Sequence, residues 1–233
     1  MAFRRNCFLA LVAGGISAAS SVSAAPTVIN GSFEAVQIGS PFFTSNPADI
    51  PGWTHSGTVG DGLLWAIGYH DGGGSVTVAG DGKQFVTLGG GFDVPGSASW
   101  STDVTGLTAG DVYDVKFDIA NEGADVGGPQ TMTVGFTAGS STSSKSFTAP
   151  ANGVNYWRFW LPETYQFVAS ASSATLNFSV TNQAEDMGLD AVSVVTGSTI
   201  PEPSTWAMLL TGFAGLGYMG LRKSRRAARE IAA

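Results

Sequence analysis

Apolar and polar residues alternate with a period of two through the middle of the chain. In residues 112–119 every second residue, starting at Tyr113, is apolar, and the positions between hold Asp114, Lys116 and Asp118. Residues 131–136 and 174–181 repeat this alternation, with small residues on the polar side. One apolar and one polar face is typical of strands in an antiparallel sheet that buries one side.

Five further strands are predicted from shorter apolar runs, at residues 63–69, 84–88, 98–104, 155–161 and 189–195. The Gly- and Ser-rich tracts at 72–74, 89–91 and 139–144 are predicted to be loops. No long stretch of the middle shows the 3.6-residue period of a helix. We therefore expect an all-β fold, namely an antiparallel β-sandwich of the jelly-roll type.

The first 25 residues have the organisation of a secretory signal peptide. Arg4 and Arg5 supply positive charge, residues 8–16 form a short apolar core, and residues 22–26 offer the small residues of a cleavage site. Removing this segment also removes Cys7, the only cysteine of the chain. The mature protein would therefore have no disulfide, thiol nucleophile or thiolate metal site.

The C-terminal tail combines a polar motif, an apolar run and a basic cluster. Pro201, Glu202 and Pro203 precede an apolar run from Trp206 to Leu221, which is followed by Arg222, Lys223, Arg225 and Arg226. A helix of this run spans about 24 Å, which is less than the ~30 Å hydrocarbon core of a bilayer. The basic cluster is expected on the cytoplasmic side. These residues fit either an ordinary single-span anchor or a processed sorting signal.

The Pro-Glu-Pro tripeptide before such a run resembles the PEP-CTERM sorting signal of Gram-negative bacteria. The resemblance implies anchoring in the inner membrane, processing by an exosortase-type enzyme, and display at the cell surface or in the extracellular matrix. It also implies a link to exopolysaccharide and biofilm. The predicted organisation is a signal peptide at residues 1–25, a β-sandwich domain at 26–198, and a sorting and transmembrane signal, with a hydrophobic helix, at 199–229.

The middle of the chain is strongly acidic. Between residues 26 and 200 there are four basic and sixteen acidic residues, which gives a net charge of −12. Such a domain repels phosphates, so the composition argues against a nucleic-acid partner. Carboxylates suit calcium, although solubility alone would also explain the charge.

Five short segments occur in a characteristic order along the chain: NGSFE at 30–34, IPGW at 50–53, DGKQFVTL at 81–88, LTAGDVY at 107–113 and GLDAVSV at 188–194. In this order they resemble the galactose-binding-like jelly rolls, which include several carbohydrate-binding modules and DUF642-type wall-associated domains. Phe33 and Trp53 are expected in the core, and residues 107–110 in a tight turn. The resemblance implies a structural calcium held by Glu34 and Asp190 with nearby backbone carbonyls. Many relatives carry a second acid where this chain has Ala191, and two solvated surface acids are the alternative.

Aromatic residues provide the candidate contacts for a sugar, because flat rings stack on the C–H faces of pyranoses. Alternation in the predicted strand 155–161 places Tyr156, Arg158 and Trp160 on one face, which the charge of Arg158 would direct to solvent, and Trp157 in the core. Trp65 and Tyr69 share a face in the predicted strand 63–69 and are the other candidates.

The sequence favours no enzyme, because it contains only His55 and His70 and no recognisable catalytic motif. Two hypotheses remain. The domain either binds carbohydrate or exopolysaccharide, or it is a non-catalytic structural matrix or adhesion protein with a protein partner. Exposed aromatics on a sheet or rim would favour the first hypothesis, and a flat, uniformly polar surface would favour the second.

Overall fold

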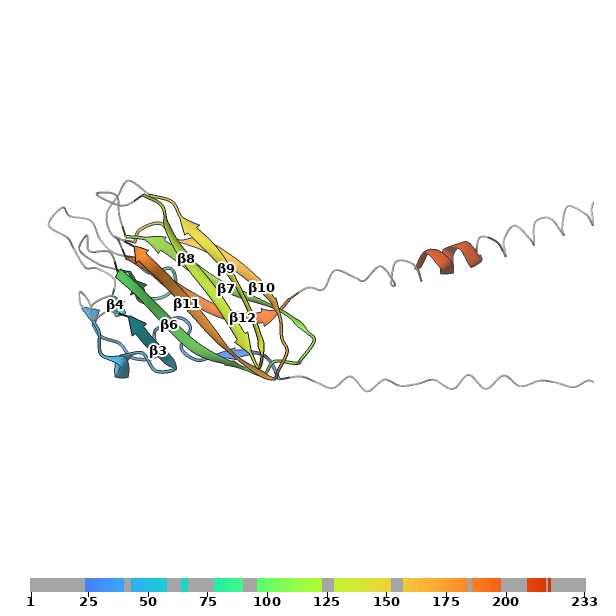
Figure 1. Ribbon diagram of the computed structural model, residues 1–233, viewed down its shortest axis with the longest axis horizontal. Coiled ribbons are helices and arrows are strands. Elements are labelled where there is room, and N and C mark those ends of the chain that lie inside the picture. The colour runs from blue at the N-terminus through green and yellow to red at the C-terminus, as the bar shows by residue number, and fades with distance from the viewer. Residues whose placement is uncertain are drawn as a thin grey trace, which may run out of the picture.

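Two antiparallel sheets form a β-sandwich of the jelly-roll type, as the alternation predicts (Figure 1). The computed structural model describes residues 24–39, 43–57, 64–66, 78–89, 96–122, 128–151, 157–183, 186–197, 209–216 and 218. Sheet A contains β1 (Thr27–Val28), β3 (Trp53–Gly57), β6 (Gly96–Thr105), β8 (Gln130–Ala138), β9 (Ser141–Ala149) and β11 (Ser173–Gln183). Sheet B contains β2 (Phe43–Thr44), β4 (Leu64–Ala66), β5 (Gln84–Leu88), β7 (Val112–Asn121), β10 (Leu161–Val168) and β12 (Met187–Thr196).

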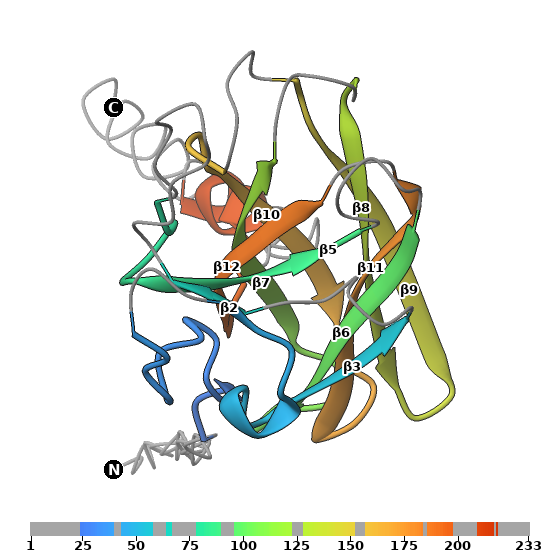
Figure 2. The ribbon, with the colours of Figure 1, turned by 90° about the vertical axis from the view of Figure 1, so that its left-hand side faces the viewer.

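The strand order connects segments that are distant in sequence. Sheet A runs β1-β6-β11-β8-β9, with β3 also paired to β6, and sheet B runs β10-β7-β12-β5-β4-β2. The short helix η1 (Pro47–Asp49) precedes β3. In Figure 2 the two sheets face each other, with β3, β6 and β9 on one side and β2, β7 and β12 on the other.

The inward faces of both sheets form one apolar core. It includes Trp100, Phe117, Phe178 and Leu176, all less than 3% exposed. Each such side chain contributes about 1.5–3 kcal/mol through removal of its apolar surface from water. Phe33 and Trp53 lie in this core as predicted, with ring centroids 5.0 Å apart.

The predicted loop at 139–144 is a β-hairpin and the start of a strand. Gly139 has a φ of +56° and turns β8 directly into β9, so that Ala138 pairs with Ser141. The sequence reading missed β9 because its exposed edge carries hydroxyl residues on both faces. Without alternation of apolar residues, a strand and a polar loop look alike in sequence.

The predicted strand at 155–161 is also wrong within its described part. Residues 158–160 have no regular secondary structure, and β10 begins only at Leu161. Trp157 has a φ of +21°, which is incompatible with an extended strand. The aromatic residues here therefore do not alternate between two faces.

The two ends of the sandwich domain leave it at the same end of the sheets (Figure 1). Thr27 pairs with Thr105 at the end of β6, and the amide of Gly197 donates to the carbonyl of Val112 at the start of β7. Residues 106–111, which join those two strands, include the predicted turn, closed by a 3.1 Å bond from Asp111 N to Thr108 O.

Candidate functional site

The outward side of sheet A consists almost entirely of hydroxyl side chains. In β3, β6, β8 and β11 core residues occupy alternate positions, and in β9 Phe147 and Ala149 do so; the positions between these inward positions point outward. Among the described side chains of these five strands, which in β11 end at Thr181, every outward position is Ser or Thr except Asp103, Gly135 and Asn177. We call this surface the hydroxyl face.

The pairing register arranges the hydroxyl face in rows that cross the strands. One row consists of Ser56, Ser99, Ser179, Thr133 and Ser146, each opposite the next on the neighbouring strand. The adjacent row consists of Thr54, Ser101, Asn177, Gly135 and Ser144. Because paired strands lie about 4.8 Å apart, each row places one residue per strand at that spacing.

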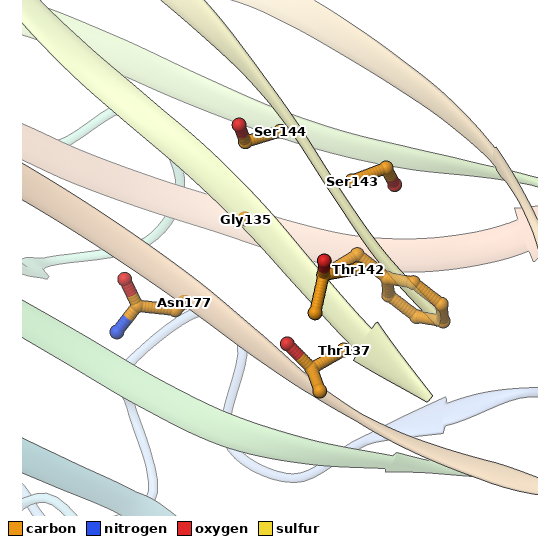
Figure 3. Close-up of a pocket in the computed structure, with 7 residues that line it drawn as sticks. Gly135, Thr137, Thr142, Ser143, Ser144 and Asn177 are labelled. Atoms are coloured by element: carbon orange, nitrogen blue, oxygen red, sulfur yellow. The ribbon is translucent and has the colours of Figure 1, made fainter. Parts of the chain in front are cut away.

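A groove of about 550 Å³ opens in this face where β8 carries Gly135 (Figure 3). The residues that line it are Gly135, Phe136, Thr137, Thr142, Ser143, Ser144 and Asn177. An ideal Cβ on Gly135 would approach no other atom closer than 3.9 Å, so the glycine leaves unfilled space between its neighbours. Figure 3 shows Thr137 and Thr142 side by side on β8 and β9, with Asn177 on β11.

The chemistry of the groove is that of neutral hydrogen bonding. Five of its seven lining residues offer hydroxyl or carboxamide groups, which both donate and accept, whereas Gly135 and Phe136 offer none, and none of the seven is ionisable. Neighbouring hydroxyls are ordered by cross-strand bonds, such as the 3.0 Å contact between Thr133 Oγ1 and Ser146 Oγ. The site can therefore bind polar, uncharged groups, but its lining offers no general acid or base.

Sequence reasoning missed this groove. Its β9 residues lie in the tract predicted to be a loop, and Asn177 is an ordinary polar residue of an alternating strand. The signal that could have found it is the glycine at position 135, which interrupts the hydroxyl residues of β8.

The two predicted aromatic contacts that the structure describes, Trp65 and Trp160, lie on the opposite side of the molecule, on the outer face of sheet B. Trp65 is only 4% exposed there, in a cluster with Phe85, Ala120 and Trp157. The Trp65 and Trp157 ring centroids are 5.0 Å apart. Trp157 is fully buried, in line with its predicted place in a core, and Trp65 presents no open ring face to a ligand.

The segment before β10 holds the other described candidates. Arg158 is exposed, and Trp160 is half-buried, with its indole N–H donating to Val78 O at 2.8 Å. Phe159, which alternation would have placed with Trp157, is 58% exposed. Tyr69 and Tyr156 lie outside the described residues. The structure therefore brings Trp65 and Trp160 into one cluster with Trp157, away from the groove.

Glu34 and Asp190, the predicted calcium ligands, approach the same turn from two segments. Glu34 Oε1 accepts from the amides of Lys83 and Gln84 at 2.5 and 2.6 Å. Asp190, at a bulge in β12, accepts from Asp81 N at 2.8 Å and from Ala191 N at 2.7 Å. The carboxylates thus hold residues 81–84 between the N-terminal segment and β12.

Burial dominates the electrostatics around Asp190. It raises the pKa of this carboxyl to about 8, although hydrogen bonds from the backbone of Asp81, Ala191 and Gly80 act in the opposite direction. Burial, and then the charge of Asp81, also raise the pKa of Asp118. Within the described part of the chain, no three His, Cys, Asp or Glu residues form a group that could hold a metal. A calcium site here would need backbone carbonyls in addition to the two carboxylates.

Part of the predicted membrane segment is helical. Residues 209–216 form a helix with exposed side chains, and among the described residues no helix is long and apolar enough to cross a membrane. The Pro201–Glu202–Pro203 motif, Trp206, Leu221, the basic cluster and residues 1–23 of the predicted signal peptide lie outside the described residues.

No family model and no curated protein matches the chain. Among solved structures, it is similar to the module TmCBM61 in complex with β-1,4-galactotriose, with 19% identity and a TM-score of 0.50 over 72% of this chain and 97% of that one. It is also similar to the CBM22-1 xylan-binding domain of Paenibacillus barcinonensis Xyn10C, with 14% identity and a TM-score of 0.42 over 78% and 100% of the chains. These similarities concern the jelly-roll fold.

Proposed function

We propose that this chain is an exported, non-catalytic protein whose β-sandwich binds carbohydrate in the groove at Gly135. The observation that carries the proposal is a groove on an open sheet whose five polar lining residues carry only neutral hydroxyl and carboxamide groups. Sugars present the same neutral groups, and a few fixed polar contacts are what orients a ligand in a binding site. The similarity in fold to a module crystallised with galactotriose supports the same function.

The proposed destination is the cell surface or the extracellular matrix. The order of Pro-Glu-Pro, apolar run and basic cluster supports a PEP-CTERM signal that anchors the chain in the inner membrane until an exosortase-type enzyme processes it. In this proposal, the tail determines where the polysaccharide is held, and the sandwich domain binds it.

A structural calcium is part of the proposal. Its support is the convergence of Glu34 and Asp190 on the turn 81–84 from opposite ends of the domain sequence. Calcium would join the N-terminal segment to β12 and so stabilise the domain, without taking part in binding at the groove.

The second candidate function is a structural matrix or adhesion protein with a protein partner. The uniformly polar hydroxyl face favours it, because the described outward positions of that face carry no aromatic ring on which a sugar could stack. The two functions differ in whether the purified protein binds polysaccharide at all.

Filling the groove tests the proposed function. The variant Gly135→Val adds a β-branched side chain where an ideal Cβ meets nothing within 3.9 Å, so the strand should tolerate it while ligand space is lost. We expect affinity for a neutral polysaccharide, measured by affinity electrophoresis of the full-length protein, to fall at least about 10-fold, the ratio that ~1.4 kcal/mol represents.

The matched control is Thr164→Val, an exposed substitution on the outer face of sheet B. It should leave the affinity unchanged. If neither variant alters retention, or if the wild-type protein is retained by no polysaccharide, the groove is not a carbohydrate site.

A further inference from the structure

The groove is one part of a larger regular surface. Its row, from Thr54 through Asn177 to Ser144, has a neighbouring row in which all five strands carry a hydroxyl, from Ser56 to Ser146. Five strands at about 4.8 Å give rows about 19 Å long. This length exceeds one sugar ring and suits several units of a polymer that crosses the strands.

The charge of this surface restricts the kind of polymer. Within its described strands, the only ionisable outward residue is Asp103, whose carboxylate accepts from Thr175 Oγ1 at 3.2 Å. Lys145 of β9 lies between the outward residues Ser144 and Ser146 and is therefore not on the hydroxyl face. Its ammonium lies over the Phe147 ring, 4.6 Å from the ring centroid. An acidic polysaccharide would therefore meet no cation on the hydroxyl face and would be repelled by the domain's net charge of −12.

We propose, on the basis of the function proposed above, that the ligand is an uncharged polysaccharide lying across the strands of the hydroxyl face. It is recognised by rows of hydroxyl and carboxamide groups that cross the strands, and not by aromatic stacking. Each hydrogen bond only replaces one to water and is individually weak. Binding therefore depends on many contacts along an extended chain, so short oligosaccharides bind much more weakly than the polymer.

The first test compares polymers of different charge with the full-length protein. Affinity electrophoresis would use β-1,4-galactan, xylan and mixed-linkage glucan as neutral polymers, and alginate and polygalacturonate as acidic ones. We expect retention by at least one neutral polymer, little effect of added salt, and no retention by the acidic ones. Preferential retention by acidic polymers would overturn this inference but leave carbohydrate binding intact. Retention by none would overturn both.

The second test removes hydroxyls outside the groove. The triple variant Ser99→Ala, Ser179→Ala and Ser146→Ala removes three hydroxyl groups from the neighbouring row. We expect this variant to be retained about 10-fold more weakly by the neutral polymer. The control, Thr164→Ala, Ser193→Ala and Thr196→Ala, removes three exposed hydroxyls from sheet B and should change nothing.

If the row variant binds like the wild type while Gly135→Val does not bind, a single chain occupies the groove alone. That result would contradict binding across the whole hydroxyl face without contradicting carbohydrate binding in the groove. Equal thermal unfolding curves for both triple variants would exclude a loss of fold as the cause of weaker retention.

Discussion

At the scale of single residues, the outer face of sheet B depends on glycine at position 188. This position of β12 points outward, beneath the aromatic cluster, and an ideal Cβ there would lie 2.7 Å from Trp160 Cη2 and 2.8 Å from Trp157 Cδ1. Both distances are shorter than carbon atoms tolerate. The absence of a side chain therefore allows the two indoles to rest on the strand.

We predict that Gly188→Ala lowers the free energy of unfolding by about 1–3 kcal/mol, because the added methyl group overpacks the cluster. Chemical denaturation monitored by tryptophan fluorescence would measure the change. Gly135→Ala is the matched control, since its Cβ would have only ordinary contacts at 3.9 Å or more. Equal destabilisation by the two substitutions would contradict the packing argument.

At the scale of elements, the turn 81–84 joins the N-terminal segment to sheet B. Gln84 is buried at the start of β5, and its side-chain amide donates to Phe33 O at 2.7 Å and to Val36 O at 2.8 Å. Its Oε1 accepts from Ile38 N at 2.8 Å. Together with Glu34, it satisfies backbone groups that burial would otherwise leave without partners, a loss that costs about 1–3 kcal/mol per group.

The calcium proposal belongs to this turn. After chelation and dialysis, we expect calcium to raise the melting temperature of the full-length protein, because an ion that binds only the folded state stabilises it. Glu34→Gln should abolish the increase while keeping Oε1 as an acceptor for the amides of Lys83 and Gln84. The idea fails if stripped wild-type protein melts at the same temperature with and without calcium.

At the scale of the whole molecule, the position of the chain ends relates the binding surface to the tail. The tail begins after Gly197, beside Val112 at one end of the sandwich, whereas the hydroxyl face covers the broad side of sheet A. If the proposed anchor holds the chain beyond Gly197, the point of attachment lies at that end and not on the broad side of sheet A. The proposed anchoring and the proposed binding do not compete for the same surface.

We predict that replacing Pro201, Glu202 and Pro203 by alanines leaves the protein unprocessed in the inner-membrane fraction. The wild type should appear at the cell surface or in the medium, with its leader and its tail removed. Immunoblots of cell fractions and mass spectrometry of the termini would measure both. Recovery of the intact wild-type chain from the cytoplasm, with its signal peptide uncut, would contradict the proposed localisation.

Local apolar patterns were sufficient to predict the central strands. β5 was predicted with its observed bounds, and β6, β7, β11 and β12 with small differences at their ends. Alternation predicted β7 and β11, because an apolar residue at every second position fits a strand with one buried face, whereas β5, β6 and β12 were predicted from shorter apolar runs. It failed at β9, where an exposed edge needs no apolar face, and at residues 158–160, where packing on the outside of sheet B replaces extended structure. Closely spaced aromatics there looked like a strand.

The sequence by itself determined the fold class, the inward core positions and the acidic character of the domain, because each depends on residue type and short spacing. Only the tertiary structure decided where function could reside. Strand register brings Asn177, Gly135 and Ser144 from three strands into one row, and no local pattern encodes that neighbourhood. The same long-range packing buries Trp65 and Trp157 against each other, since the burial of a ring depends on what covers it.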